Sequence, residues 1–249
     1  MVIVDRDICA GCGSCVPYCT VGAIALVGDK AVIDTERCTD CYVCLRNKVC
    51  PVEALSPGPL ETFHDQFRHV LSDPTVTTAE TSVPGRGTEE SKTNDVTGRV
   101  RHGEVGFAID MGRPGVGVRL SDVEKVAVAC TKAGLVLESP NVSPLGKVLS
   151  DQKTGQMQPE ARDHYLLSVI IEGKCPLSGL KNVLLALKQV EKEIDSVFSL
   201  GLIMRPEKDG TFPGLKVLDE LGIPQPFRGK VNVGLGRPLY EDRAQGVVS

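Results

Sequence analysis

Eight of the ten cysteines lie in the first fifty residues, where they form two copies of one metal-ligand pattern. The first copy comprises Cys9, Cys12, Cys15 and Cys19, and the second comprises Cys38, Cys41, Cys44 and Cys50. Three cysteines at two-residue spacing, with a fourth a few residues later, form a loop that can wrap a [4Fe–4S] cluster. Thiolate is the soft ligand that the iron of such clusters prefers. A chain with two such patterns is expected to move single electrons.

The two patterns also predict how the ligands are shared. In two-cluster loops of this kind, the fourth cysteine of each run binds the other cluster. Cluster I is therefore expected to take Cys9, Cys12, Cys15 and Cys50. Cluster II is expected to take Cys38, Cys41, Cys44 and Cys19. This crossed ligation would join the two halves of the segment and keep the clusters close enough for electron exchange.

Residues 1–57 as a whole resemble a two-cluster, clostridial-type ferredoxin. Residues 2–4 fit its first strand, while residues 23–26 and 31–33 flank a Gly28-Asp29 turn and predict a β-hairpin. The resemblance implies two pseudo-symmetric half-domains, each with a cluster loop, a helical turn and short strands. It also implies electron transfer through two [4Fe–4S] clusters.

Two positions depart from the family pattern. Thr20 follows Cys19, where the family usually has proline, and five residues rather than three separate Cys44 from Cys50. Proline at the first position shapes a turn but is no ligand, so the ligand prediction is unaffected. The longer spacing predicts an added turn of helix near cluster II.

Zinc and disulfides fit the cysteine spacing less well than clusters do. A zinc site with four thiolates uses two separated pairs of cysteines, not two triplets. A disulfide framework is typical of secreted chains, and residues 1–5 lack the basic start and long apolar stretch of a signal peptide. Air-sensitive clusters in a reducing compartment indicate a cytoplasmic protein from an anaerobic or microaerobic host.

Composition argues against two further classes of partner. The longest apolar runs are far too short to span a bilayer, so no membrane partner is expected. The net charge is −4 and tryptophan is absent, which argues against nucleic acid. A length of 249 residues leaves room for a second domain after the ferredoxin segment.

Residues 58–104 are expected to form a linker. They begin with a short amphipathic stretch, residues 60–71, which predicts a helix packed on the ferredoxin segment. Residues 72–104 contain many Thr, Ser, Gly, Glu and Lys residues and few large apolar ones, as a polar tether does. A loop of this length is either mobile or functional.

A candidate anion site lies in the glycine-rich parts of the chain. Residues 85–99 combine glycines and hydroxyl side chains with Arg86, Lys92 and Arg99, and backbone N–H groups with such cations can bind an anion. Arg113, within residues 112–117, is the fourth candidate cofactor-binding residue. Neither segment matches a phosphate loop or a dinucleotide fingerprint, so a solvated tether and a plain glycine-rich turn remain alternatives.

Residues 105–205 alternate between strand and helix patterns. Strands are expected at 105–111, 135–137, 165–172 and 196–204, and helices run from a capping box at Ser121 to Gly134 and from Pro176 to Ile194. This order predicts a ferredoxin-like, split βαβ sandwich of the α+β class, a topology that ACT regulatory domains also use. Residues 206–249 form a C-terminal extension with a short helix at 215–221 and a strand at 230–235.

The second domain is also a candidate association surface. Residues 166–171 are apolar at nearly every position, which is typical of a strand buried on both faces. An uncovered apolar sheet face would bind a neighbour, so we expect a homodimer or hetero-complex through this domain. Cys130 and Cys175 are expected to be structural thiols in its core.

Three functions fit these observations. The first is electron transfer, as the iron–sulfur component of a larger anaerobic oxidoreductase that acts with a redox partner protein. The second is a self-contained reductase that holds an anionic substrate or cofactor in the Gly/Arg-rich loops. The third is a redox or ligand sensor with an ACT-like domain. A specific second cofactor site would separate them, and the sequence contains no motif for one.

Overall fold

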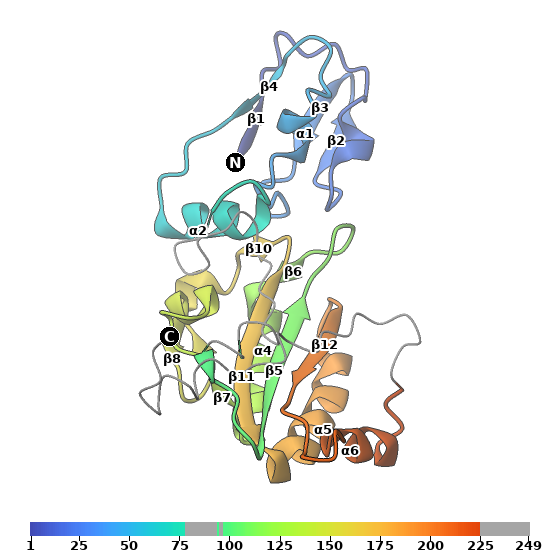
Figure 1. Ribbon diagram of the computed structural model, residues 1–249. Helices are drawn as coiled ribbons and strands as arrows, with labels where there is room; N and C mark the ends of the chain where they lie inside the picture. The colour runs from blue at the N-terminus through green and yellow to red at the C-terminus, as the bar shows by residue number, and fades with distance from the viewer. Residues whose placement is uncertain (78–93, 95–96, 225–249) are drawn as a thin grey trace, which may run out of the picture.

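The computed structural model describes residues 1–77, 94 and 97–224, and Figure 1 shows their arrangement. Helices and antiparallel sheets are mixed, so the protein is of the α+β class, as the sequence predicts. The buried apolar residues of this part form one cluster within residues 2–54 and a second cluster that extends from Phe67 to Leu218. We call residues 1–57 the head and residues 97–224 the second domain.

Two short antiparallel strand pairs organise the head. β1 (Val2–Val4) pairs with β4 (Leu55–Pro57), which brings the two ends of the head together. β2 (Ile24–Val27) and β3 (Lys30–Ile33) form the expected hairpin. The 3₁₀ turn η1 (Val16–Tyr18) follows the first cysteine triplet, and α1 (Val43–Arg46) lies where the longer cysteine spacing predicts a helical turn.

A four-stranded antiparallel sheet forms the centre of the second domain. Its order is β12 (Phe198–Ile203), β5 (Glu104–Met111), β11 (Val169–Pro176) and β7 (Val136–Leu137). Along β5, Val105, Phe107, Ile109 and Met111 alternate with less buried residues and are almost completely buried. This period of two is what a strand with one covered face requires.

Two helices cover that buried face. α4 (Leu120–Lys132) and α5 (Leu180–Val190) contact each other and contribute their apolar stripes to the same core as β5. The buried positions of α5 are Leu180, Val183, Leu184, Leu187 and Val190. They recur every three or four residues, so they lie on one side of the helix.

Short elements complete the second domain. The strands are β6 (Val118–Arg119) with β10 (Tyr165–Leu166), and β8 (Leu149–Asp151) with β9 (Gln156–Met157). The helical pieces are η2 (Pro144–Lys147), η3 (Pro159–Ala161), η4 (Leu177–Gly179), η5 (Glu191–Glu193) and α6 (Gly214–Glu220). α6 matches the helix expected at 215–221, whereas the strand expected at 230–235 lies outside the described residues.

The strand expected at 165–172 is in fact two strands. β10 ends at Leu166 and pairs with β6, while β11 begins at Val169 in the main sheet. Between them, the N–H of Leu167 donates to Oγ of Ser72 (3.1 Å) rather than to a neighbouring strand. Because that acceptor belongs to a distant segment, the apolar run itself contained no sign of the break.

The capping box expected at Ser121 is also not formed. α4 begins at Leu120, and its first N–H groups are bound by main-chain oxygens instead of a side chain. The N–H of Leu120 donates to the carbonyl of His164 (3.0 Å), and that of Ser121 to the carbonyl of Arg162 (2.9 Å). A tertiary contact therefore satisfies the helix terminus. Similarly, Pro176 ends β11 and does not begin α5.

The sheet face away from the helices is not the apolar surface that the sequence predicted. The register places Ala108 opposite Glu172 and Asp110 opposite Ile170 on this face. Lys174 lies there too, and it pairs with Glu104 (3.0 Å). Small and charged residues therefore predominate on this face. Every second residue of β5 and β11 is a buried apolar one, and these residues face the helices. The apolar sheet face that led us to expect association is therefore not present. Association of two chains through this domain stays a prediction.

A helix joins the head to the second domain inside the expected linker. α2 (Phe63–Ser72) begins with a capping box in which Thr62 and Asp65 exchange hydrogen bonds. Phe67 and Leu71 are buried in the core of the second domain. Arg68 and His69 instead contact Asp40 of the head. The helix expected at 60–71 is thus present as α2, and Figure 1 shows it lying between the two parts.

The junction contains a pair of stacked imidazoles, and protonation of one of them, His164, should loosen it. His64 of α2 stacks on His164, with ring centroids 5.0 Å apart. Burial lowers the pKa of His164, and the nearby charges of His64 and Arg68 act in the same direction, although Asp65 and Asp163 oppose them. The unfolded histidine, with a pKa of 6.5, therefore binds its proton more readily than the folded one. The contribution of His164 to stability is fully present above that value and is lost as the pH falls below it, through the lower pKa of the folded histidine.

We expect amide exchange in α2, corrected for intrinsic rates, to accelerate when the pH is lowered from about 7.5 to about 6. His164→Gln should remove most of that acceleration. Equal protection factors at both pH values in the parent protein would contradict this assignment.

Candidate metal centres

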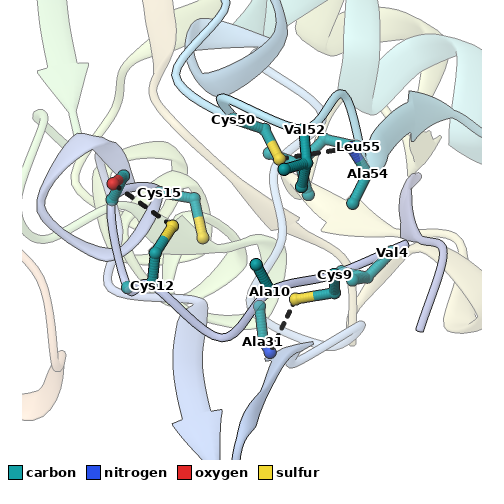
Figure 2. A pocket seen from close by; sticks show the side chains of 12 residues that line it. Val4, Cys9, Ala10, Cys12, Cys15, Ala31, Cys50, Val52, Ala54 and Leu55 are labelled. Atoms are coloured by element: carbon teal, nitrogen blue, oxygen red, sulfur yellow. Dashed lines mark hydrogen bonds between the residues drawn. The ribbon is translucent and has the colours of Figure 1, made fainter. Parts of the chain in front are cut away.

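The first cavity of the head is lined by Cys9, Cys12, Cys15 and Cys50 (Figure 2). Cys50 comes from the second cysteine run, so the structure brings together the four residues predicted for cluster I. In Figure 2 their sulfur atoms point toward one common space. Val4, Val52 and Leu55 supply apolar wall around it.

The second cavity contains the other four cysteines of the head. Cys38, Cys41 and Cys44 line it together with Cys19 from the first run. The arrangement therefore repeats the crossed pairing of the first cavity.

The two cysteine loops have the same backbone shape but different residues at the strained positions. Gly11 and Gly13, which flank Cys12, have φ angles of 65° and 72°. Asp40 and Tyr42 flank Cys41 in the same way, and both have φ of 54°. A side chain in this left-handed region costs roughly 1–2 kcal/mol. The second loop must therefore be stabilised by contacts that the first does not need.

Backbone N–H groups point at several of the sulfur atoms. The N–H of Ala23 donates to Sγ of Cys19 (3.0 Å), and that of Ala54 donates to Sγ of Cys50 (3.2 Å). Both donors lie four residues after their cysteine, which again reflects the internal repeat. The N–H of Ala31 donates to Sγ of Cys9 (3.4 Å). Such donors stabilise the thiolate form that binds metal.

The thiols are suited to metal rather than to free thiolate chemistry. Hydrogen bonds lower the pKa of Cys9 and Cys12. Burial raises the pKa of Cys15 and Cys38, and burial together with the neighbouring thiolates raises the pKa of Cys44 to about 12. Four thiolates in one apolar cavity thus need positive charge between them, and iron would supply it. The donor set fits an iron–sulfur cluster.

A buried ion pair positions the second loop. Asp40 is completely buried, and its carboxylate lies 2.7 Å from Nη2 and 2.9 Å from Nε of Arg68. The amino group of Met1 is 3.4 Å from the same carboxylate. The carbonyl of Asp40 lies 2.8 Å from Nδ1 of His69, whose ring packs 4.5 Å from that of Tyr42. α2 therefore holds both strained residues of the loop.

The candidate anion site is not assembled among the described residues. Arg86 and Lys92 lie outside them. The carbonyl of Arg99 accepts a hydrogen bond from Lys174, opposite Gly106 at one end of β5. Arg113 lies near the other end of β5, where it pairs with Asp110 (3.0 Å) and donates to Ser199 (2.5 Å). Four residues of strand between these ends span roughly 13 Å, so Arg99 and Arg113 do not form one site.

The remaining candidate residues have structural positions. Cys130 and Cys175 are buried in the second core, and burial raises the pKa of these thiols to about 12 and about 11. In the described ranges, no group of three or more His, Cys, Asp or Glu side chains is arranged to hold a single metal ion. No described helix is long and apolar enough to cross a membrane.

Sequence reasoning missed Asp40, Arg68 and His69. Asp40 lies inside a metal-binding loop, but its helix partners follow 28 and 29 residues later. The sequence contained one sign of this contact: Asp40 precedes Cys41 at the position where Gly11 precedes Cys12 in the first loop.

Comparison with known proteins supports the assignment of the head. Over 56 residues in its N-terminal part, the chain is 41% identical to a ferredoxin of Pyrobaculum islandicum. The match covers 22% of this chain and 50% of the relative, so the chain spans about half the length of the curated relative it matches. No protein-family model matches the chain, and no solved structure matches it. The head is ferredoxin-like, and its clustered cysteines fit an iron–sulfur protein.

Arg68→Met should destabilise the protein, because it leaves the Asp40 carboxylate buried with only the chain terminus nearby. Breaking a buried pair in this way costs about 3 kcal/mol or more, measurable by anaerobic urea denaturation. The double variant Asp40→Asn/Arg68→Met should recover most of that loss. Lys181→Met is the control, since Lys181 also contacts a carboxylate, that of Glu220, but both side chains of that pair are exposed. Equal losses for the two single variants would show that the Asp40 pair has no special role.

Proposed function

We propose that this protein transfers electrons through two [4Fe–4S] clusters, cluster I on Cys9, Cys12, Cys15 and Cys50 and cluster II on Cys38, Cys41, Cys44 and Cys19. The main support is that each cavity contains three cysteines of one run and the fourth of the other. When bound, each cluster accepts and releases one electron. The ferredoxin relative supports iron–sulfur electron transfer by the head.

The residues of the chain would then perform three tasks. The cysteines bind iron, and the N–H groups of Ala23, Ala31 and Ala54 stabilise charge on the sulfur atoms. The apolar walls limit contact between water and the clusters, which influences the reduction potential. Crossed ligation keeps the clusters close, because Cys15 and Cys19 belong to different cavities and four residues span at most roughly 14 Å.

For the second domain, we propose a ferredoxin-like, split βαβ sandwich. The element order β5, α4, β7, β11, α5 and β12, with sheet order β12-β5-β11-β7, supports this assignment. Many unrelated functions use this topology, so it assigns no ligand. The separation of Arg99 from Arg113 argues against an anion site shared by these two residues, and a self-contained reductase stays the alternative proposal. We therefore favour a cytoplasmic carrier or oxidoreductase component with a redox partner protein.

Iron analysis after anaerobic reconstitution tests the cluster content. We expect eight iron atoms per chain, because two cubanes contain four each. Cys130→Ala and Cys175→Ala are matched controls and should leave that number unchanged. About four iron atoms per chain, or bound zinc, would refute the proposal.

Single serine variants test the crossed ligation. Cys19→Ser should damage the cluster that Cys38→Ser damages, and Cys50→Ser should damage the cluster that Cys9→Ser damages, because these pairs share cavities. Electron paramagnetic resonance of the reduced proteins would identify the lost signal. Pairing of Cys19 with Cys9 would instead show that each run binds its own cluster.

A further inference from the structure

A threonine connects cluster II to the second domain. Oγ1 of Thr20 lies 3.2 Å from Sγ of Cys41, across two loops of the head. The carbonyl of the same threonine accepts a hydrogen bond from the N–H of Gly115. Gly115 belongs to residues 112–117, the glycine-rich segment between β5 and β6. This segment therefore contacts the head directly beside the second cavity.

The chemistry of a bound cluster determines the direction of the hydrogen bond. A cysteine that ligates iron is a thiolate and has no proton to donate. The threonine hydroxyl must then be the donor to Cys41. A hydrogen bond to a ligating sulfur stabilises negative charge on the cluster, and reduction adds one such charge. Hydrogen bonds of this type are among the factors that set cluster potentials.

The second domain fixes the segment that holds Thr20. The hydroxyl of Tyr165 donates to the carbonyl of Val116, next to Gly115. The ring of Tyr165 lies over Gly117, where a Cβ atom would come within 2.5 Å of it. Tyr165 also packs against the core of the head. The position of the Gly115 N–H, and hence of Thr20, thus depends on β10.

The first cavity has a comparable contact between a hydroxyl and a cysteine sulfur, but no contact with the second domain is described for it. Oγ of Ser14 lies 3.3 Å from Sγ of Cys12, but the two residues are neighbours in one exposed loop. Cys12 is exposed, whereas Cys41 is partly buried. A hydrogen bond is electrostatically stronger where less water surrounds it. The two contacts therefore offer a matched comparison within one protein.

We propose that the second domain raises the reduction potential of cluster II by holding the Thr20 hydroxyl on Cys41. This inference rests on the proposed function, since it requires that Cys41 ligate a cluster. Thr20 acts on the ligand directly, and Tyr165 is a positioning residue that acts through Gly115. Thr20 stands where the family usually has proline. Proline has no hydroxyl and could not donate this hydrogen bond to Cys41.

Redox titration of the reconstituted protein, followed by electron paramagnetic resonance, tests the role of the hydroxyl. Thr20→Val should lower the midpoint of one cluster, so that its ratio of reduced to oxidised form falls roughly three- to tenfold at a fixed potential. Thr20→Ser keeps the donor and should keep the parent midpoint. Ser14→Ala should shift the other cluster only. Unchanged midpoints in Thr20→Val, or an equal shift in Thr20→Ser, would overturn the proposal.

A double-mutant cycle tests the contribution of the second domain. Tyr165→Phe removes the hydroxyl that binds Val116 but keeps the ring, so it should lower the same midpoint as Thr20→Val. Adding it to Thr20→Val should produce no further shift, because both act through one hydrogen bond. A Tyr165→Phe protein with parent midpoints would show that the second domain has no such role. Iron content distinguishes the two levels: eight atoms with unmoved midpoints contradict only this inference, whereas fewer atoms in the parent protein contradict the proposed function.

Discussion

Four thiolates within one apolar cavity repel one another and are poorly solvated, and this constraint shapes the whole head. Burial raises the pKa of Cys15, Cys38 and Cys44, so the free protein opposes the ionisation that metal binding requires. Directed N–H groups offset part of that opposition without adding charge. Gly22 and Glu53, which directly precede the donors Ala23 and Ala54, have positive φ angles, and so do the residues that flank Cys12 and Cys41. Ligand geometry, backbone strain and electrostatics therefore depend on one another, and both cysteine loops combine them in the same way.

The second loop, around Cys41, needs an additional contact that the first loop does not need. Where the first loop has glycines, the second has Asp40 and Tyr42. The carboxylate of Asp40 lies 3.7 Å from Sγ of Cys38, so it adds negative charge beside the second cavity. Arg68 neutralises this charge from outside the head. The same helix inserts Phe67 and Leu71 into the other core. The geometry of the second cysteine cavity is thus linked to the packing of a domain that contributes none of its cysteines.

Much of this architecture follows from local sequence. The cysteine spacings indicate the two sets of four that the cavities contain, and the Gly28-Asp29 turn predicts the hairpin of β2 and β3. The apolar periodicities of α4, α5 and β5 were also legible, because each side chain that faces the core recurs at the spacing of its own element. What could not be predicted depends on residues far apart in the chain. Examples are the bond from Leu167 to Ser72 that separates β10 from β11, and the pairing of Asp40 with Arg68. The polar face of the sheet was missed because a short apolar run does not reveal which side of a strand faces solvent.

The position of α2 also limits how far the head is a separable module. A fragment that stops at residue 57 would retain all eight cysteines of the two cavities and the β1–β4 pair. It would lose Arg68 and His69, so the Asp40 side chain would have only the chain terminus as a counter-charge. It would also lose Gly115, which anchors Thr20. An evolutionary or engineered transfer of this head to another protein would therefore have to bring α2 along or replace Asp40 with a residue that needs no partner, such as the glycine of the first loop.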